Sequence, residues 1–292
     1  MTHFTQKFLI VLLLVVAMAA CGPRAVHQPE PVVSVSILPL QYFVDELTGQ
    51  ALDVNVMVPQ GASHGTYSPS PRQMQRLSNS GLYLRIGSLG YEQAFLHRIN
   101  EINPHMKAVD LNDGVQLIRG IIDHGDHVHE GGIDPHIWMS PKVMLSQLPV
   151  IRDALIEVYP ELEETVAANY DALYAEVESV HREMVAVTEG LARRSFMIFH
   201  PALTYLARDY GLEQVSIEHE GKEPSPAQLS RLIRKAREHN IRVIFIQEEY
   251  DRRNAELVAD EAGGEVVQVN PLLYDWPMGM THLMETFKQY LQ

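Results

Sequence analysis

The chain has 292 residues, of which 46% are hydrophobic and 21% charged. It is therefore long enough for two ordinary domains, and its composition excludes a disordered protein. Acidic residues outnumber basic ones by 37 to 23, for a formal net charge of −14, which argues against a nucleic-acid partner because nucleic acids bind through basic surfaces. The single cysteine excludes an internal disulfide and a thiolate-rich zinc site.

The N-terminus is typical of a secretory signal peptide, expected over residues 1–20. Lys7 precedes an apolar run over 8–16 that is too short to span a bilayer. Small residues then lead directly into Cys21, as in the lipobox of bacterial lipoproteins. We expect lipidation at Cys21, a Pro-rich tether over 21–31 and a mature protein anchored outside the cytoplasm. An ordinary signal peptide with an incidental cysteine is the alternative, and the sequence does not say which membrane holds the anchor.

Short β-rich runs alternate with amphipathic stretches in the region 32–159. The expected helices are 39–49, 71–78 and 91–101, followed by one that begins near Pro141. The expected strands are 32–37, 52–57, 82–86 and 107–111. Such alternation predicts an N-terminal lobe with a parallel sheet covered by helices.

A long helix is expected over 160–192. No Gly or Pro occurs from Glu161 to Glu189, and apolar residues recur at an average spacing close to that of one helical face. A helix of this length spans about 45 Å at a rise of 1.5 Å per residue. It is expected to join two lobes as a rigid connector that permits only a small hinge motion.

The alternation resumes over 193–292. Helices are expected near 201–210, 226–238, 252–261 and 278–291. Strands are expected at 195–199, 213–217, 242–246 and 265–269. The predicted fold is α/β, with two lobes that each carry a four-stranded parallel sheet flanked by helices and one long rigid helix between them. Because open α/β sheets bind ligands at the carboxyl ends of their strands, the site is expected in the interlobe cleft.

Four side chains at this cleft are candidate metal ligands. His64, His136, His200 and Asp275 lie in loops, two from each lobe, and His200 directly follows a predicted strand. Three neutral imidazoles and one carboxylate suit a tetrahedral Zn²⁺ site. For any one of these histidines alone, a hydrogen-bonded loop residue would be the simpler interpretation.

The mature chain resembles the solute-binding lipoproteins of zinc/manganese-type ABC importers over essentially its whole length. The motifs that carry the resemblance are HGTYSPSP (64–71), DPHIWMSP (134–141), HPALTYLARDYGL (200–212), EGKEPSPAQL (220–229) and NPLLYDW (270–276). The resemblance implies that His64, His136 and His200 are metal ligands, with Asp275 as the fourth. It also implies a monomer that delivers metal to an ABC transporter permease.

The third ligand bears on the choice of metal. Manganese-selective relatives tend to carry Glu at the position of His200, and the extra nitrogen favours Zn²⁺, with Mn²⁺ as the alternative. The chain also departs from the family pattern. Thr66 and Tyr67 stand where many relatives have a Glu, which leaves Asp275 as the expected oxygen ligand.

The acidic, His-rich segment 123–132 resembles a short version of the loop common in zinc-importing relatives. It contains His124, His127 and His129, which we treat as a candidate auxiliary metal site. A solvated surface loop without metal is the alternative interpretation.

High-affinity extracytoplasmic capture of Zn²⁺ for an ABC permease is the expected function. A zinc hydrolase, with three His ligands and an Asp base, is a weaker alternative because the chain has no HExxH, GxSxG or Walker motif. An adhesin lipoprotein is a third possibility that nothing else in the sequence supports. Because imidazole binds metal only when neutral, zinc affinity is expected to fall as the pH drops through about 6–6.5.

Overall fold

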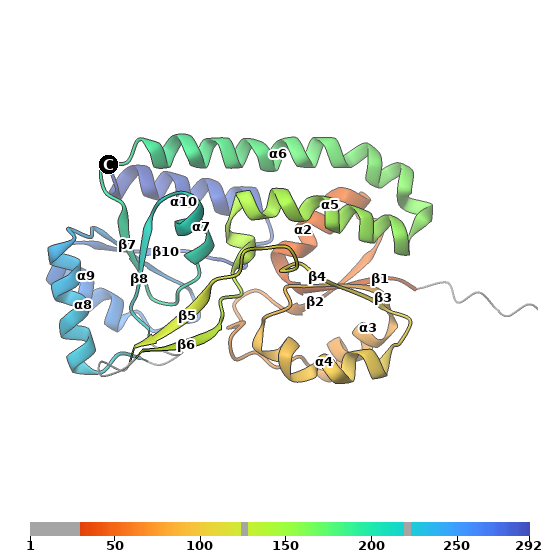
Figure 1. Ribbon diagram of the computed structural model, residues 1–292, viewed down its shortest axis with the longest axis horizontal. Helices are drawn as coiled ribbons and strands as arrows, with labels where there is room; N and C mark the ends of the chain where they lie inside the picture. The colour runs from red at the N-terminus through yellow and green to blue at the C-terminus, as the bar shows by residue number, and fades with distance from the viewer. Residues whose placement is uncertain (1–29, 124–127, 219–222) are drawn as a thin grey trace, which may run out of the picture.

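Two four-stranded parallel sheets form the framework of the molecule (Figure 1). A computed structural model describes residues 30–123, 128–218 and 223–292. The first sheet has the order β2-β1-β3-β4 and consists of β1 (Glu30–Ile37), β2 (Asp53–Val58), β3 (Ser80–Arg85) and β4 (Lys107–Asp110). β1 is central and fully parallel to both neighbours, since Val33 pairs with Val54 on one side and with Leu82 on the other.

The second sheet has the order β10-β9-β7-β8. Its strands are β7 (Ser195–Ile198), β8 (Glu213–Ser216), β9 (Val243–Ile246) and β10 (Glu265–Gln268). Every residue of β9 is buried, as expected of a parallel strand covered on both faces. All eight strands expected for the two parallel sheets are present, with ends that differ by one or two residues. β1 begins at Glu30, inside the segment expected to be a tether.

Helices cover both sheets (Figure 1). In the first half of the chain they are α2 (Leu38–Thr48), α3 (Pro71–Asn79), α4 (Gly90–Ile102) and α5 (Pro141–Val158), with a short 3-10 turn η1 (Ile137–Met139) before α5. The second half has η2 (Pro160–Leu162), α6 (Glu163–Glu189), α7 (Thr204–Asp209), α8 (Pro226–Glu238), α9 (Arg253–Ala262) and α10 (Trp276–Tyr290). Ser225 caps α8 through a capping box with Gln228, as the EPSPAQ sequence predicts.

α6 is the long helix that the apolar spacing predicts, and it packs along α2, α5 and α10 (Figure 1). Its buried face includes Val166, Leu173, Val177 and Met184. These side chains belong to one continuous apolar core that also contains residues of both sheets. The two halves of the molecule are therefore joined by shared packing as well as by the helix.

A two-stranded antiparallel hairpin was not expected from the sequence. It consists of β5 (Arg119–Asp123) and β6 (Val128–Ile133), in which Ile122 pairs with His129. The segment 123–132, expected to be a loop, therefore contributes mostly to a hairpin. Among the described residues no helix combines the length and the apolar character needed to cross a bilayer.

Candidate metal centre

Three histidines converge at the carboxyl edges of the two sheets. His64 lies in the loop after β2, His136 at the N-cap position of η1, and His200 two residues after the end of β7. The Nε2 atom of His64 lies 2.7 Å from that of His136 and 3.2 Å from that of His200. All three are the residues that the sequence predicts, and together they form a group able to hold a metal ion.

The geometry of this triad suits a single cation. Nitrogen ligands lie about 2.0–2.1 Å from Zn²⁺, so two of them in a tetrahedral site are about 3.4 Å apart. The 3.2 Å separation between His64 and His200 is close to this value, whereas the 2.7 Å between His64 and His136 is shorter and is a hydrogen-bond distance. Neighbouring nitrogen lone pairs also repel each other unless a proton or a cation lies between them. The convergence of three Nε2 atoms is therefore the arrangement expected of a metal site.

Two carboxylates, the buried Glu218 and the nearly buried Asp134, contact two of the imidazoles at Nδ1. Asp134 Oδ1 lies 2.8 Å from Nδ1 of His136 and also accepts a bond from its backbone N–H. Both carboxylate oxygens of Glu218 lie within 3.1 Å of Nδ1 of His200. An anion at Nδ1 keeps the proton there, so Nε2 presents its lone pair to the metal. Neither carboxylate was expected from the sequence, although Asp134 stands only two residues before His136.

Burial favours the neutral form of His64 and His136. It lowers the pKa of His64 well below the usual range, and the neighbouring imidazoles lower it further. It also lowers the pKa of His136, although Asp134 partly opposes this effect. Burial alone would raise the pKa of Asp134, but its interactions with His136 outweigh this effect and the pKa is lowered. Asp134 is therefore ionised and His136 neutral, the protonation states that metal binding requires.

A further layer of side chains fixes the ligand loops. Gln247 contacts the backbone of His200 twice, accepting from its N–H and donating to its carbonyl oxygen at 2.8 Å. Trp138, which is fully buried, packs against the ring of His136 at 5.1 Å between centroids. The hydroxyl of Tyr205 donates to the carbonyl oxygen of Asp134 at 2.8 Å. Trp138 and Tyr205 are both fully buried beside the triad.

The structure does not bring Asp275 to the triad. Its carboxylate caps α10, where Oδ1 accepts a hydrogen bond from the N–H of Met278 at 2.9 Å. Its neighbours are Tyr42, Glu46 and Tyr274, whose pKa values its charge helps to raise. In this conformation Asp275 therefore acts as a helix cap.

The remaining candidates lie mostly outside the described residues. Cys21, His124 and His127 belong to segments of which the structure describes nothing, and for His129 it gives only a backbone position on β6. Neither lipidation nor the auxiliary metal site is tested by these positions.

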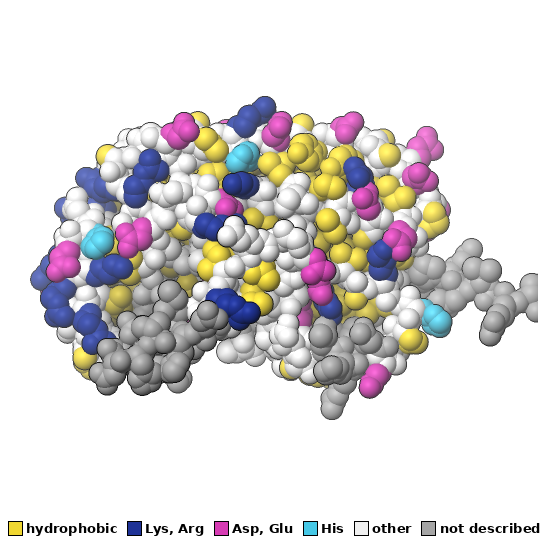
Figure 2. Space-filling model, in the orientation of Figure 1, with side chains coloured by type: hydrophobic (Ala, Val, Ile, Leu, Met, Phe, Trp, Pro, Cys, Tyr) yellow, Lys and Arg dark blue, Asp and Glu magenta, His cyan; other side chains and the backbone are white. Residues whose placement is uncertain are grey.

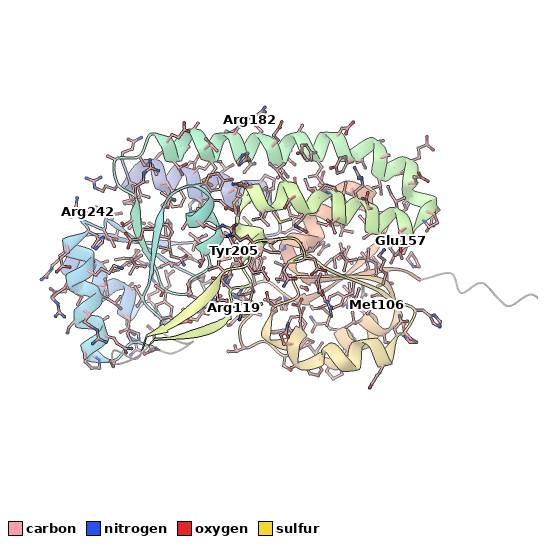
Figure 3. The ribbon with its side chains drawn as sticks, viewed as in Figure 1. Met106, Arg119, Glu157, Arg182, Tyr205 and Arg242 are labelled. Atoms are coloured by element: carbon pink, nitrogen blue, oxygen red, sulfur yellow. The ribbon has the colours of Figure 1, made fainter. Side chains whose placement is uncertain are left out.

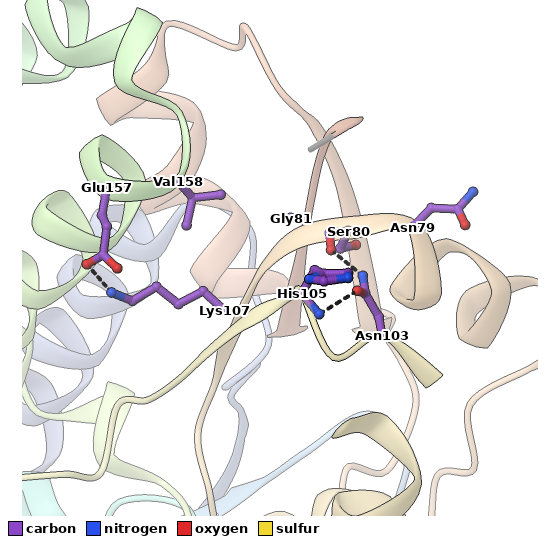
Figure 4. Close-up of a pocket in the computed structure, with 8 residues that line it drawn as sticks. All are labelled: Asn79, Ser80, Gly81, Asn103, His105, Lys107, Glu157 and Val158. Atoms are coloured by element: carbon purple, nitrogen blue, oxygen red, sulfur yellow. Dashed lines mark hydrogen bonds and ion pairs between the residues drawn. The ribbon is translucent and has the colours of Figure 1, made fainter. Parts of the chain in front are cut away.

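Two cavities differ in their relation to the triad. A small one, of about 10 Å³, is lined by His64, Glu248, Glu249 and Asn270 and has room for about one water molecule. A larger one, of about 350 Å³, lies at the amino ends of β3 and β4, the opposite edge of the sheet (Figure 4). Its polar groups bind one another, since Lys107 pairs with Glu157 and Asn103 donates to the carbonyl of Ser80. The larger cavity therefore does not reach the triad. With only the small cavity beside His64, the triad is nearly closed to solvent.

The family to which the chain belongs follows from comparison with known proteins. The model of the family described as "Zinc-uptake complex component A periplasmic" (ZnuA) matches residues 33–290. The chain belongs to this family. A crystal structure of ZnuA has a TM-score of 0.81 and 33% sequence identity to this ZnuA-family chain, covering 89% of it and 99% of the solved chain. A zinc-bound deletion mutant of ZnuA has a TM-score of 0.80 and 33% identity, covering 89% and 98%.

Curated members of the ZnuA family are more distant in sequence. The zinc-binding lipoprotein AdcA of Streptococcus pneumoniae is 26% identical over 279 residues, which cover 91% of this chain and 55% of AdcA. The chain thus spans about half the length of AdcA. The high-affinity zinc uptake system protein ZnuA of Bacillus subtilis is 25% identical over 248 residues, or 80% of this chain and 76% of that protein. ZnuA-family proteins are binding components of an uptake complex and not enzymes, so the hydrolase alternative is set aside.

Proposed function

We propose that this protein captures Zn²⁺ outside the cytoplasm and delivers it to the membrane permease of an ABC importer. The convergence of the Nε2 atoms of His64, His136 and His200 carries the proposal. Family membership and the zinc-bound ZnuA structure support the same ligand and role. The protein must then bind and release the ion without transforming it, and a buried, nearly closed site suits tight capture.

The choice of zinc rests on the donor set. Three imidazole nitrogens form a softer set than the oxygen-rich sites that Mn²⁺ prefers. Manganese remains the alternative cargo, since a solved relative of the same fold, FpvC of Pseudomonas aeruginosa, is described in complex with Mn²⁺. His200→Glu replaces one nitrogen with a hard oxygen and should shift preference towards Mn²⁺.

Competition calorimetry of Zn²⁺ and Mn²⁺ tests this proposal on chelator-stripped wild-type protein and on His200→Glu. We expect one tightly bound Zn²⁺ per wild-type chain and a relative gain of Mn²⁺ affinity in the variant. A wild-type preference for Mn²⁺ would leave the import role standing with a different cargo. If neither metal bound, the triad would have no part in transport.

The fourth coordination position is a separate question. Asp275 is proposed as the fourth ligand only in a metal-bound conformation in which it leaves the cap of α10. Asp275→Asn keeps the cap, because Asn caps helices as well as Asp does, but supplies a poorer metal ligand. A lower zinc affinity in this variant with unchanged stability would support ligation. Equal affinity would show that water or another small ligand completes the sphere.

The anchor and the auxiliary site are proposed on sequence grounds. Cys21→Ser should release the protein from the membrane fraction, as expected if Cys21 carries lipid. Replacing His124, His127 and His129 together by Ser should reduce the number of weakly bound zinc ions and leave the tight one. An unchanged number of bound zinc ions per chain would rule out the auxiliary site.

A further inference from the structure

A groove runs between the outer edge of the second sheet and α8, and it shares no lining residue with the small cavity beside His64. It has a volume of about 310 Å³. Its floor and walls combine apolar, polar and charged side chains from β8, the residues directly after it and α8: Val215, Ser216, Ile217, Glu218, Gln228, Arg231, Leu232 and Lys235. Metal binding alone does not account for this surface.

One wall of the groove is the edge of a sheet. β8 is the last strand in the order β10-β9-β7-β8, so among the described strands it pairs only with β7. The N–H groups of Glu213 and Ile217 point inward and donate to Arg194 and Ile198. Because these directions alternate along a strand, the backbone groups of Ser216 point outward. Such an edge can pair with an extended segment of another chain.

The other wall is basic in a strongly acidic protein. Residues 226–242 contain five Lys or Arg and one Asp or Glu, against a net charge of −14 for the whole chain. Lys and Arg side chains gather at the end of the molecule formed by α8 and α9 (Figure 2). Arg231 and Arg234 are exposed. Lys235 lies 3.4 Å from Glu213, and its three donors allow it to bind a second carboxylate.

The inner end of the groove reaches the metal centre. Glu218 lines the groove and is also the carboxylate that holds Nδ1 of His200. A molecule seated in the groove would therefore lie beside a group that positions a metal ligand. Among the described residues that line the groove, Glu218 is the one hydrogen-bonded to the histidine triad, so it links the two sites.

We propose that this groove docks an extended acidic segment of the partner permease, an inference that rests on the proposed import function. The segment pairs with the edge of β8, and its carboxylates bind Arg231 and Lys235. Pairing along the edge of β8 shifts Glu218, which lies two residues after the strand, and so loosens the hold of that carboxylate on His200. Docking therefore speeds the release of zinc where the permease can accept it.

The test uses the full-length protein and its own zinc permease in nanodiscs of neutral phosphatidylcholine. Arg231→Glu should weaken binding to the permease by about tenfold, and Arg231→Gln by less, while zinc affinity in solution stays unchanged. Arg182→Glu is the control, because Arg182 is an equally accessible helical arginine on the outer side of α6 (Figure 3). Transfer of zinc to a chelator should be faster with the permease, and Arg231→Glu should remove this acceleration.

The outcomes separate the docking site from the import function. If zinc binds normally but Arg231→Glu and Arg182→Glu bind the permease like wild type, the groove is not the docking site. If wild-type protein fails to bind zinc, the proposed function itself fails. A last arm uses vesicles that contain anionic phosphatidylglycerol and no permease. Equally tight, Arg231-dependent binding to these vesicles would overturn the proposal in favour of a lipid surface.

Discussion

The metal centre contains two carboxylates that lie behind the histidine ligands and are not themselves expected to bind the metal. Asp134 lies behind His136, and the buried Glu218 lies behind His200. Carboxylates behind two of the ligands favour a divalent cation, because an anion away from solvent is costly without a compensating positive charge in a medium of low dielectric constant.

Removing either carboxylate charge should therefore weaken zinc binding. We expect Asp134→Asn and Glu218→Gln each to lower zinc affinity by about 10–100-fold, the usual cost of losing a group that orients a ligand imidazole. Competition with a chromophoric chelator measures the change. Asp171→Asn, an exposed position on α6, is the control and should bind like wild type. Unchanged affinity in both site variants would show that the carboxylates serve folding only.

The metal-free protein should lose stability in acid. The pKa values of His64 and His136 are lowered in the folded state, whereas an unfolded His titrates near about 6.5. Below that pH the unfolded chain takes up protons that the folded chain does not. The free energy of unfolding therefore falls as the pH drops below about 6.5. For the same reason, zinc binding should persist to a lower pH than free imidazole would allow.

Urea denaturation between about pH 7.5 and about pH 5.5 measures this slope. His64→Asn removes one of the two titrating groups and should make the decrease shallower. An equal slope in wild type and variant would show that His64 does not contribute.

At the residue scale the sequence predicts the metal ligands better than the side chains that orient them. His64 and His200 lie in loops that follow strands of the parallel sheets, so sheet topology alone places them at the cleft, whereas His136 lies between the unpredicted strand β6 and η1. Asp275 also follows a strand, but it directly precedes Trp276 and Pro277 at the start of α10, so it caps the helix. Glu218 lies 18 residues from His200, and only the pairing of β7 with β8 brings them together.

Among the elements, the segment around η1 is held from two sides. Trp138 donates from Nε1 to the carbonyl of Pro271, and Trp276 donates in turn to the carbonyl of Trp138, both at 2.8 Å. On the other side, Ser140 donates to Asp209 at 2.6 Å. These bonds join the loop that carries His136 to the second half of the chain. The position of His136 relative to His200 is therefore fixed by hydrogen bonds across the cleft.

The buried cap of α5 should matter more than an exposed one. Ser140 Oγ accepts from the N–H of Val143 and also donates to Asp209, whereas Ser225 only serves the exposed capping box of α8. We expect Ser140→Ala to cost about 2 kcal/mol of unfolding free energy and Ser225→Ala about 1 kcal/mol. Urea unfolding compares the two directly. Equal costs would mean that the bond to Asp209 contributes nothing.

The elements that the sequence predicts are those with a periodic apolar pattern. The strands of both sheets and the face of α6 follow from that pattern. The hairpin β5-β6 does not, because its second strand, VHEGGI, contains two glycines and two polar residues and has no apolar alternation. Cross-strand pairing with β5 determines its structure. The long helix begins at Glu163 and not at Pro160, because residues 160–162 form the 3-10 turn η2.

In the whole molecule, the two sheets share one apolar core. Val33 and Leu84 of the first sheet, Phe196 and Phe245 of the second, and Val177 of α6 belong to the same buried cluster. A second, smaller cluster lies between the second sheet and α8 and α9. Shared packing of this kind opposes independent movement of the two halves, so a large hinge motion would have to break the common core.

The metal-free protein should accordingly unfold in one thermal transition. Zinc binds only the folded state, so free zinc at about 100 times Kd should add about 2.7 kcal/mol and raise Tm by roughly 5–10 °C. Scanning calorimetry with and without zinc measures both. Two separate transitions, of which zinc shifted only one, would show that the halves fold independently.

The shared core also affects how backbone amide hydrogens exchange with solvent. If both sheets open only when the common core opens, their most protected N–H groups exchange with solvent through the same global event. Amides in β3 and in β9, at opposite ends of the molecule, would then show one common exchange free energy. Zinc held by three side chains at the cleft would slow exchange at both ends by the same factor, although neither strand contributes a ligand.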